Sequence, residues 1–87
     1  MLDKIAKDAI IAKYATHKND TGSPQVQIAL LTAEIKELTG HLVAHKKDYS
    51  SRRGLMRKVS ERRRLLKYLK REDAKGYAEL TESLKLA

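Results

Sequence analysis

The fold is decided by residues 23–44, which read SPQVQIALLTAEIKELTGHLVA. Apolar side chains recur here at alternating steps of three and four, the spacing that aligns them along one side of an α-helix. They are Ile28, Leu31, Ile35, Leu38 and Leu42. Ser23 and Pro24 are typical of a helix start, because the serine hydroxyl can cap the first turn and proline has no N–H to leave unpaired there. The stretch therefore predicts one long helix whose apolar seam needs a partner.

The next segment of the chain supplies that partner. A short connection at about residues 45–48 favours an antiparallel neighbour, and either Asp48 or Ser50 can cap a helix that runs to about Arg71. The expected buried side of this helix comprises Leu55, Val59, Leu66 and Leu69. Together the two long segments predict an antiparallel helical hairpin.

A short helix is expected before the hairpin, at about residues 3–15. Its apolar side consists either of Ile5, Ala9 and Ala12 or of Ile10 and Ile11. Residues 17–23 are expected to form a loop, because Asn, Asp and Gly in this stretch favour turns.

Another short helix is expected after the hairpin. Asp73 can cap it, and Tyr77, Leu80 and Leu84 would point inward, although Gly76 weakens it by about 1 kcal/mol. The predicted fold class is all-α with four helices: a short N-terminal helix, a long antiparallel helical hairpin and a short C-terminal helix. Residues 1–87 are expected to form one domain, whose first helix (about 3–16) is loosely attached.

The composition argues against several classes of function. The chain has no cysteine, and its three histidines lack an acidic cluster, so neither a metal site nor a cofactor is expected. At 87 residues it is small for an enzyme with a deep pocket. No apolar run approaches the roughly 18 residues that cross a bilayer, and the N-terminus does not resemble a targeting signal. A cytoplasmic protein without catalytic activity is predicted.

Positive charge is concentrated in one third of the chain. Residues 41–71 contain twelve Lys or Arg and two acids, whereas the other 56 residues contain seven bases and nine acids. Like charges in a folded domain repel one another, so such a segment favours a polyanionic partner. Nucleic acid is the first candidate and an anionic membrane surface the second.

Helical geometry arranges these bases into a row. At about 100° per residue, the side chains within about 40° of one direction on the third helix are Arg53, Arg57, Arg64, Tyr68 and Arg71. We call them the arginine row. The apolar residues of this helix lie roughly opposite. A merely solvated helix face would intersperse glutamates among the bases, so the row is interpreted as a binding face, with Tyr68 available for stacking unless it belongs to the core.

The second helix adds polar residues at steps of seven, namely Gln27, Glu34 and His41. In an antiparallel hairpin Gln27 lies near Tyr68, and His41 lies near the start of the third helix. Fourteen residues at 1.5 Å each separate the two ends by about 20 Å. Two separate contact patches on a rigid rod suit a folded RNA.

Three segments carry a family resemblance: DTGSPQVQIALLT (residues 20–32), HKKDYSSRRGL (45–55) and RRRLLKYLKRED (62–73). The chain resembles bacterial small-subunit ribosomal protein fifteen over essentially its whole length. The resemblance implies a four-helix protein that binds small-subunit rRNA and nucleates the platform of the subunit among neighbouring ribosomal proteins. It also implies an intersubunit bridge to large-subunit rRNA.

The resemblance also implies two sets of contact residues. A three-way RNA junction would be held by Thr21, Gly22, Gln27, Arg64, Tyr68 and Arg71. The minor groove of a duplex with a G·U/G·C element would be bound by His41, His45, Asp48 and Ser51. Lys46, Lys47, Arg53 and Arg57 are expected to contact phosphates. Tyr49 and Ser50 replace the His-His of many relatives, and Glu34 is left out of the site because a carboxylate repels phosphate.

Other interpretations remain open. Asp48 can be only a helix cap, and Gly22 only a turn glycine. For the whole chain, a DNA-binding helical module is disfavoured because no helix has recognition side chains clustered at its N-terminus. A membrane-surface helix is disfavoured because the apolar seams are used by the core and lack tryptophan.

Overall fold

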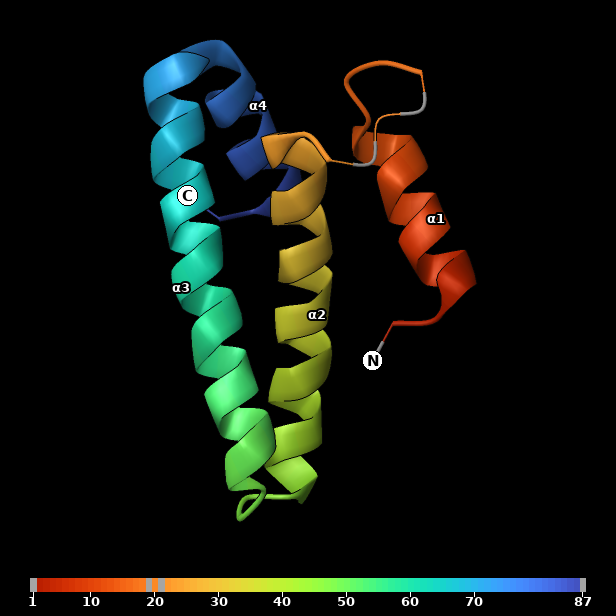
Figure 1. Ribbon diagram of the computed structural model, residues 1–87, viewed down its shortest axis with the longest axis vertical. Coiled ribbons are helices and arrows are strands. Elements are labelled where there is room, and N and C mark those ends of the chain that lie inside the picture. The colour runs from red at the N-terminus through yellow and green to blue at the C-terminus, as the bar shows by residue number, and fades with distance from the viewer. Residues whose placement is uncertain (1, 19, 21, 87) are drawn as a thin grey trace.

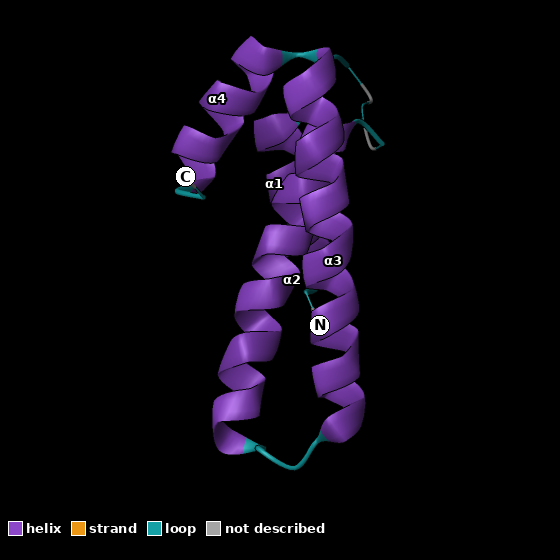
Figure 2. Cartoon of the chain, turned by 90° about the vertical axis from the view of Figure 1, so that its left-hand side faces the viewer, coloured by secondary structure: helices purple, strands orange, loops and turns teal. Residues whose placement is uncertain are grey.

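The computed structural model describes residues 2–18, 20 and 22–86. Within them the chain forms the helices α1 (Lys4–Tyr14), α2 (Pro24–Ala44), α3 (Tyr49–Glu72) and α4 (Ala74–Leu84), and no strand. Both views show α2 and α3 side by side as an antiparallel hairpin (Figures 1 and 2). The predicted fold class and the order of the four helices are confirmed.

Each helix begins at a side-chain cap, and this explains why the boundaries could be read from the sequence. Asp3, Ser23, Asp48 and Asp73 each accept a hydrogen bond from a backbone N–H in the first turn of the helix that follows. Of the two candidates for the start of α3, Asp48 is the cap and Ser50 lies inside the helix.

The predicted seams form the core at one end of the hairpin. Ile28 of α2, Leu69 of α3 and Leu80 of α4 are buried together. The partly buried side chains that pack against them are Tyr14, Leu65, Leu66, Tyr77, Leu84 and Leu86. α4 folds back beside this end of the hairpin (Figure 2), so the core joins all four helices there.

α1 lies beside α2 (Figure 1). Ile10 and Ile11 are partly buried, whereas Ile5 is 82% exposed and Ala9 and Ala12 are also exposed. The second of the two predicted apolar sides is therefore correct and the first is wrong. α1 packs against α2 through a side that also brings Tyr14 to the core, and Tyr14 Oη lies 2.9 Å from Ser83 Oγ of α4.

Candidate nucleic-acid interface

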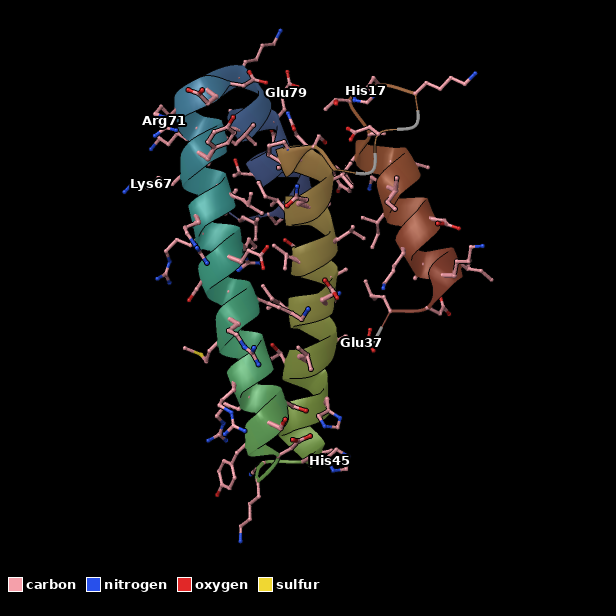
Figure 3. All side chains as sticks on the ribbon, viewed as in Figure 1. His17, Glu37, His45, Lys67, Arg71 and Glu79 are labelled. Atoms are coloured by element: carbon pink, nitrogen blue, oxygen red, sulfur yellow. The ribbon has the colours of Figure 1, made fainter. Side chains whose placement is uncertain are left out.

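The arginine row lies on the outer side of α3. All five of its side chains are exposed, and the leucines predicted opposite them are buried or half-buried. Tyr68 is 45% exposed and therefore is not a core tyrosine. The guanidinium carbon of Arg71 lies 5.5 Å from the Tyr68 ring centroid, within the range of a cation–π contact. In Figure 3 Arg71 extends away from α2, at the end of the hairpin opposite His45.

Two basic side chains of α3 are held between the two long helices. Lys58 Nζ lies 3.2 Å from Glu34 Oε2, and both side chains are mostly buried. Arg62 Nη1 donates across the hairpin to Thr32 Oγ1 at 3.4 Å. The pair with Lys58 explains the place of Glu34, which joins α2 to α3. The sequence analysis excluded Glu34 from the site but did not find its partner.

A polar cluster occupies the turn end of the hairpin. Asp48 Oδ2 accepts hydrogen bonds from Ser51 Oγ at 2.6 Å and lies 2.8 Å from His41 Nε2. Asp48 Oδ1 accepts from the backbone N–H of Ser51 at 3.0 Å. The hydrogen bonds from Ser51, with a smaller contribution from His41, hold the pKa of the Asp48 carboxyl well below its usual range. The cap and the predicted contact residue are thus the same ionised side chain.

His45 and the two turn lysines complete this end. The rings of His41 and His45 stack with centroids 4.5 Å apart. Lys46 and Lys47 are exposed in the turn. A hollow of about 200 Å³ beside the cluster is lined by Glu37, Leu38, His41 and Ser51. The residues that the sequence assigned to a duplex minor groove therefore lie together next to a concave surface.

The other polar cluster lies at the loop between α1 and α2. Gln27 Nε2 donates to the Gly22 carbonyl at 2.6 Å, so two of the predicted junction residues are in contact. Thr21 lies outside the described residues. α2 and α3 are antiparallel, so this cluster is at the same end of the hairpin as Arg64, Tyr68 and Arg71.

Asp20 organises this loop, a role that the sequence analysis missed. It is 3% exposed. Its Oδ2 accepts from Thr16 N–H and Thr16 Oγ1, and its Oδ1 accepts from the N–H groups of Gly22 and Ser23. The side-chain hydrogen bond from Ser23 and the backbone one from Thr16 hold the pKa of Asp20 well below its usual range, although desolvation opposes this. The sequence signal was present in the run from Asp20 to Ser23, but it was interpreted only as a turn.

Comparison with known proteins identifies the family of this chain. The family model described as ribosomal protein S15 matches residues 7–87. The chain belongs to the ribosomal protein S15 family. A relative from Limosilactobacillus reuteri (strain DSM 20016), small ribosomal subunit protein uS15, is 55% identical over 85 residues, which cover 98% of this chain and 96% of the relative. The protein of the same name from Heliobacterium modesticaldum is also 55% identical over 85 residues, with the same coverage. That from Ligilactobacillus salivarius is 58% identical over 80 residues, covering 92% and 90% of the two chains.

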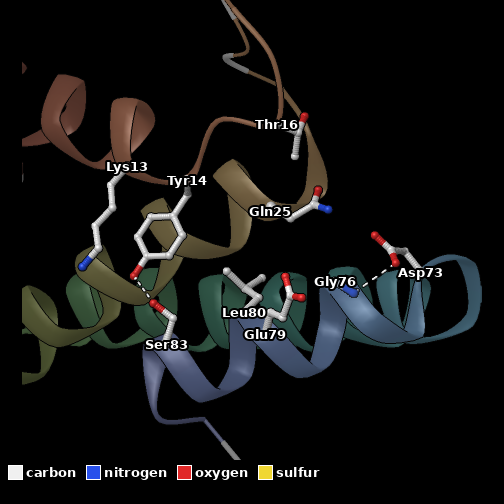
Figure 4. Close-up of a pocket in the computed structure, with 9 residues that line it drawn as sticks. All are labelled: Lys13, Tyr14, Thr16, Gln25, Asp73, Gly76, Glu79, Leu80 and Ser83. Atoms are coloured by element: carbon white, nitrogen blue, oxygen red, sulfur yellow. Dashed lines mark hydrogen bonds between the residues drawn. The ribbon is translucent and has the colours of Figure 1, made fainter.

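Membership of the ribosomal protein S15 family makes this chain a structural ribosomal protein and not an enzyme. A hollow of about 450 Å³ lies between α1, the start of α2 and α4 (Figure 4). None of the predicted contact residues lines it, and the Tyr14–Ser83 hydrogen bond crosses it. No described group of three or more His, Cys, Asp or Glu residues is arranged to hold a metal ion. In the described part of the chain, no helix has the length and apolar character needed to cross a bilayer.

Proposed function

We propose that this chain, a structural constituent of the small ribosomal subunit, binds small-subunit rRNA directly through both ends of its helical hairpin. The observation that carries the proposal is the position of two polar clusters at opposite ends of a hairpin whose α3 bears an exposed arginine row. Gln27, Glu34 and His41 share one stripe of α2. Glu34 pairs with Lys58, which on the wheel of α3 lies between the buried side and the arginine row.

At the loop end, the proposed ligand is a three-way RNA junction. Gly22, without a side chain, lets RNA approach the backbone, and Tyr68 offers an exposed ring on which a base can stack. Arg71 lies against that ring, so its guanidinium is positioned to contact a phosphate beside the stacked base. The residues assigned to this contact are Thr21, Gly22, Gln27, Arg64, Tyr68 and Arg71.

At the turn end, the proposed ligand is the minor groove of a duplex with a G·U/G·C element. A-form RNA exposes ribose hydroxyls and guanine amino groups in a shallow minor groove. Because Ser51 donates its hydroxyl hydrogen to Asp48, its oxygen lone pairs remain available to accept from a guanine amino group. His41, His45, Asp48 and Ser51 are assigned to this contact, with phosphate contacts from Lys46, Lys47, Arg53 and Arg57.

Larger roles in the ribosome rest on the family. We propose that binding nucleates assembly of the platform with neighbouring ribosomal proteins, and that the chain contributes to a bridge with large-subunit rRNA. Both proposals are supported by membership of the ribosomal protein S15 family and by the resemblance in the segments quoted above. Reconstitution of platform particles and of subunit joining with the chain omitted would test them separately.

Footprinting on naked small-subunit rRNA tests the direct contact. We expect protection at one three-way junction and along one adjoining duplex about 20 Å away, the spacing of fourteen helical residues. Tyr68→Ala and Gln27→Ala should weaken protection of the junction and leave binding to the isolated duplex fragment little changed. Equal losses on both RNAs would show that the two clusters do not contact different parts of the RNA.

A further inference from the structure

A second basic face runs along α3, separate from the arginine row. On the helical wheel its residues lie between about 220° and 280° from Arg57, so its centre is about 100° from that of the row. They are Tyr49, Arg52, Met56, Arg63, Lys67 and Lys70, and all six are exposed. We call them the second basic face.

Within α3, no acid lies on this face. The acids of α3 are Glu61 and Glu72, and on the wheel they lie at about 40° and 60°, on the side of the arginine row. Glu72 pairs there with Arg71 at 3.5 Å. The row that binds RNA in the proposed function is therefore the face with acidic neighbours, and the second basic face keeps its four positive charges without them.

The side chains of this face combine charge with exposed apolar groups. Tyr49 is 57% and Met56 60% exposed. The Arg52 guanidinium lies 5.7 Å from the centroid of the Tyr49 ring and donates to the Lys46 carbonyl at 2.9 Å, which fixes its orientation. The Tyr49 ring and the oriented Arg52 guanidinium can stack against RNA bases. Arg63 and Lys67 can contact phosphates. Figure 3 shows Lys67 extending into open space away from α2.

We propose that the second basic face binds a second segment of RNA backbone while the arginine row holds the first. The inference rests on the proposed function, because it presumes that the row is occupied by RNA. An α-helix with its side chains is about 10–12 Å across, so a duplex lying along the row cannot also cover a face turned by about 100°. RNA fits better than a protein partner. The face offers basic side chains and isolated apolar groups, but it has no continuous apolar area that a protein could bury.

The test uses the full chain and two RNAs. The chain is first saturated with an unlabelled three-way junction RNA, and a fluorescent RNA duplex without the G·U/G·C element is then titrated in. We expect a ternary complex by anisotropy and by gel shift. Arg63→Gln with Lys67→Gln should weaken the second duplex about tenfold and lower its salt slope by about two, while junction affinity stays within about twofold. Among the described residues, Arg63 and Lys67 have no ion-pair or hydrogen-bond partner that the substitutions would leave unpaired.

The matched control is Arg64→Gln with Arg71→Gln, which removes two exposed arginines of the junction set from the same helix. It should weaken the junction RNA and spare the second duplex. Failure of the wild-type chain to form a ternary complex would overturn the inference, as would equal loss of junction binding in both double variants, because both sets would then contact one RNA. Displacement of the duplex by polyglutamate as readily as by RNA would indicate an acidic protein partner instead. If the wild-type chain does not bind the junction RNA at all, the proposed function fails, and the first titration shows this by itself.

Discussion

Asp48 shows how one side chain can serve both the fold and the site. It caps α3 through the Ser51 N–H and orients the His41 ring and the Ser51 hydroxyl. Its oxygens already accept three hydrogen bonds, so in the proposed minor-groove contact its contribution would lie largely in orienting its two neighbours. The two interpretations of Asp48, as a helix cap and as part of the binding surface, are therefore compatible.

The substitution Asp48→Asn distinguishes the orienting role of this side chain from the effect of its negative charge. An amide can keep the bond from the backbone N–H with its oxygen, but its NH₂ group cannot accept from Ser51 Oγ. We expect binding to RNA with the G·U/G·C element to weaken by about 5- to 150-fold, by analogy with base-specific pairs, and binding to other duplexes to change little. The measurement is a titration of both RNAs by anisotropy. A purely electrostatic surface would bind the specific RNA more tightly after this change, because the variant is more positive. That result would mean that Asp48 serves only as a helix cap.

Asp20 and Asp48 make the stability of the chain sensitive to acid. Both carboxyls have a pKa below the ordinary value of 3.8, because each accepts several hydrogen bonds in its ionised form. The unfolded chain therefore binds more protons than the folded one below about pH 4, and stability falls as pH decreases there. Between pH 5 and 8 these two groups add no pH dependence.

Urea unfolding at a series of pH values measures this effect. The wild-type midpoint should be unaffected by these groups above pH 5 and drop below pH 4, whereas Asp20→Asn should start lower and show a shallower drop. Its amide would face Thr16 N–H, a donor, in place of the oxygen that accepts from it now. Parallel curves for the two proteins would mean that Asp20 does not titrate at a lowered pKa.

Among the elements, α3 is the one that serves the fold and the surface at once. One side packs through Leu55, Val59, Leu66 and Leu69, and the remaining circumference carries the two basic faces. The Lys58–Glu34 pair and the Arg62–Thr32 bond lie at the boundary between these regions and tie α3 to α2. The hairpin is thereby held in register, and register sets the spacing of the contact clusters.

α4 supplies a prediction about helix propensity. Glycine inside a helix usually costs about 1 kcal/mol relative to alanine, but a Cβ at Gly76 would collide with the capping Asp73 carboxylate, including its Cγ at 2.8 Å. Gly76→Ala should therefore gain helix propensity and lose a cap worth about 1 kcal/mol, with almost no net change in the free energy of unfolding.

In the Asp73→Ala background the same Gly76→Ala change should stabilise the protein by about 1 kcal/mol, since no carboxylate remains to be displaced. Chemical denaturation of the four proteins in this double-mutant cycle measures the coupling. A stabilisation of equal size in both backgrounds would show that alanine and the Asp73 cap can coexist.

At the level of the whole molecule, the hairpin is a rod with charge along its length, and the proposed RNA contacts lie at its two ends. If the arginine row and the turn lysines meet about five to seven phosphates, the slope of log K against log salt should be roughly −4 to −6. The slope can be obtained by filter binding to junction RNA between low and moderate salt. Duplex DNA at one fixed salt concentration is the control, and we expect it to bind more weakly. A slope near −1 would remove the electrostatic part of the proposed function.

The sequence by itself determined the four helices, the Ser23 and Asp73 caps and the outward position of the arginine row. These depend on local spacing and capping, such as the seam from Ile28 to Leu42 and the Ser23 cap, and both interactions act within a few residues. Only the tertiary structure decided which side of α1 packs, because Ile5–Ala9–Ala12 and Ile10–Ile11 are equally regular patterns and the choice depends on where α2 lies. It also decided that Glu34 pairs with Lys58, 24 residues away, and that Asp20 is buried among four hydrogen bonds. Charges and turn residues do not specify distant partners from sequence, because those partners are set by the packing of the helices that carry them.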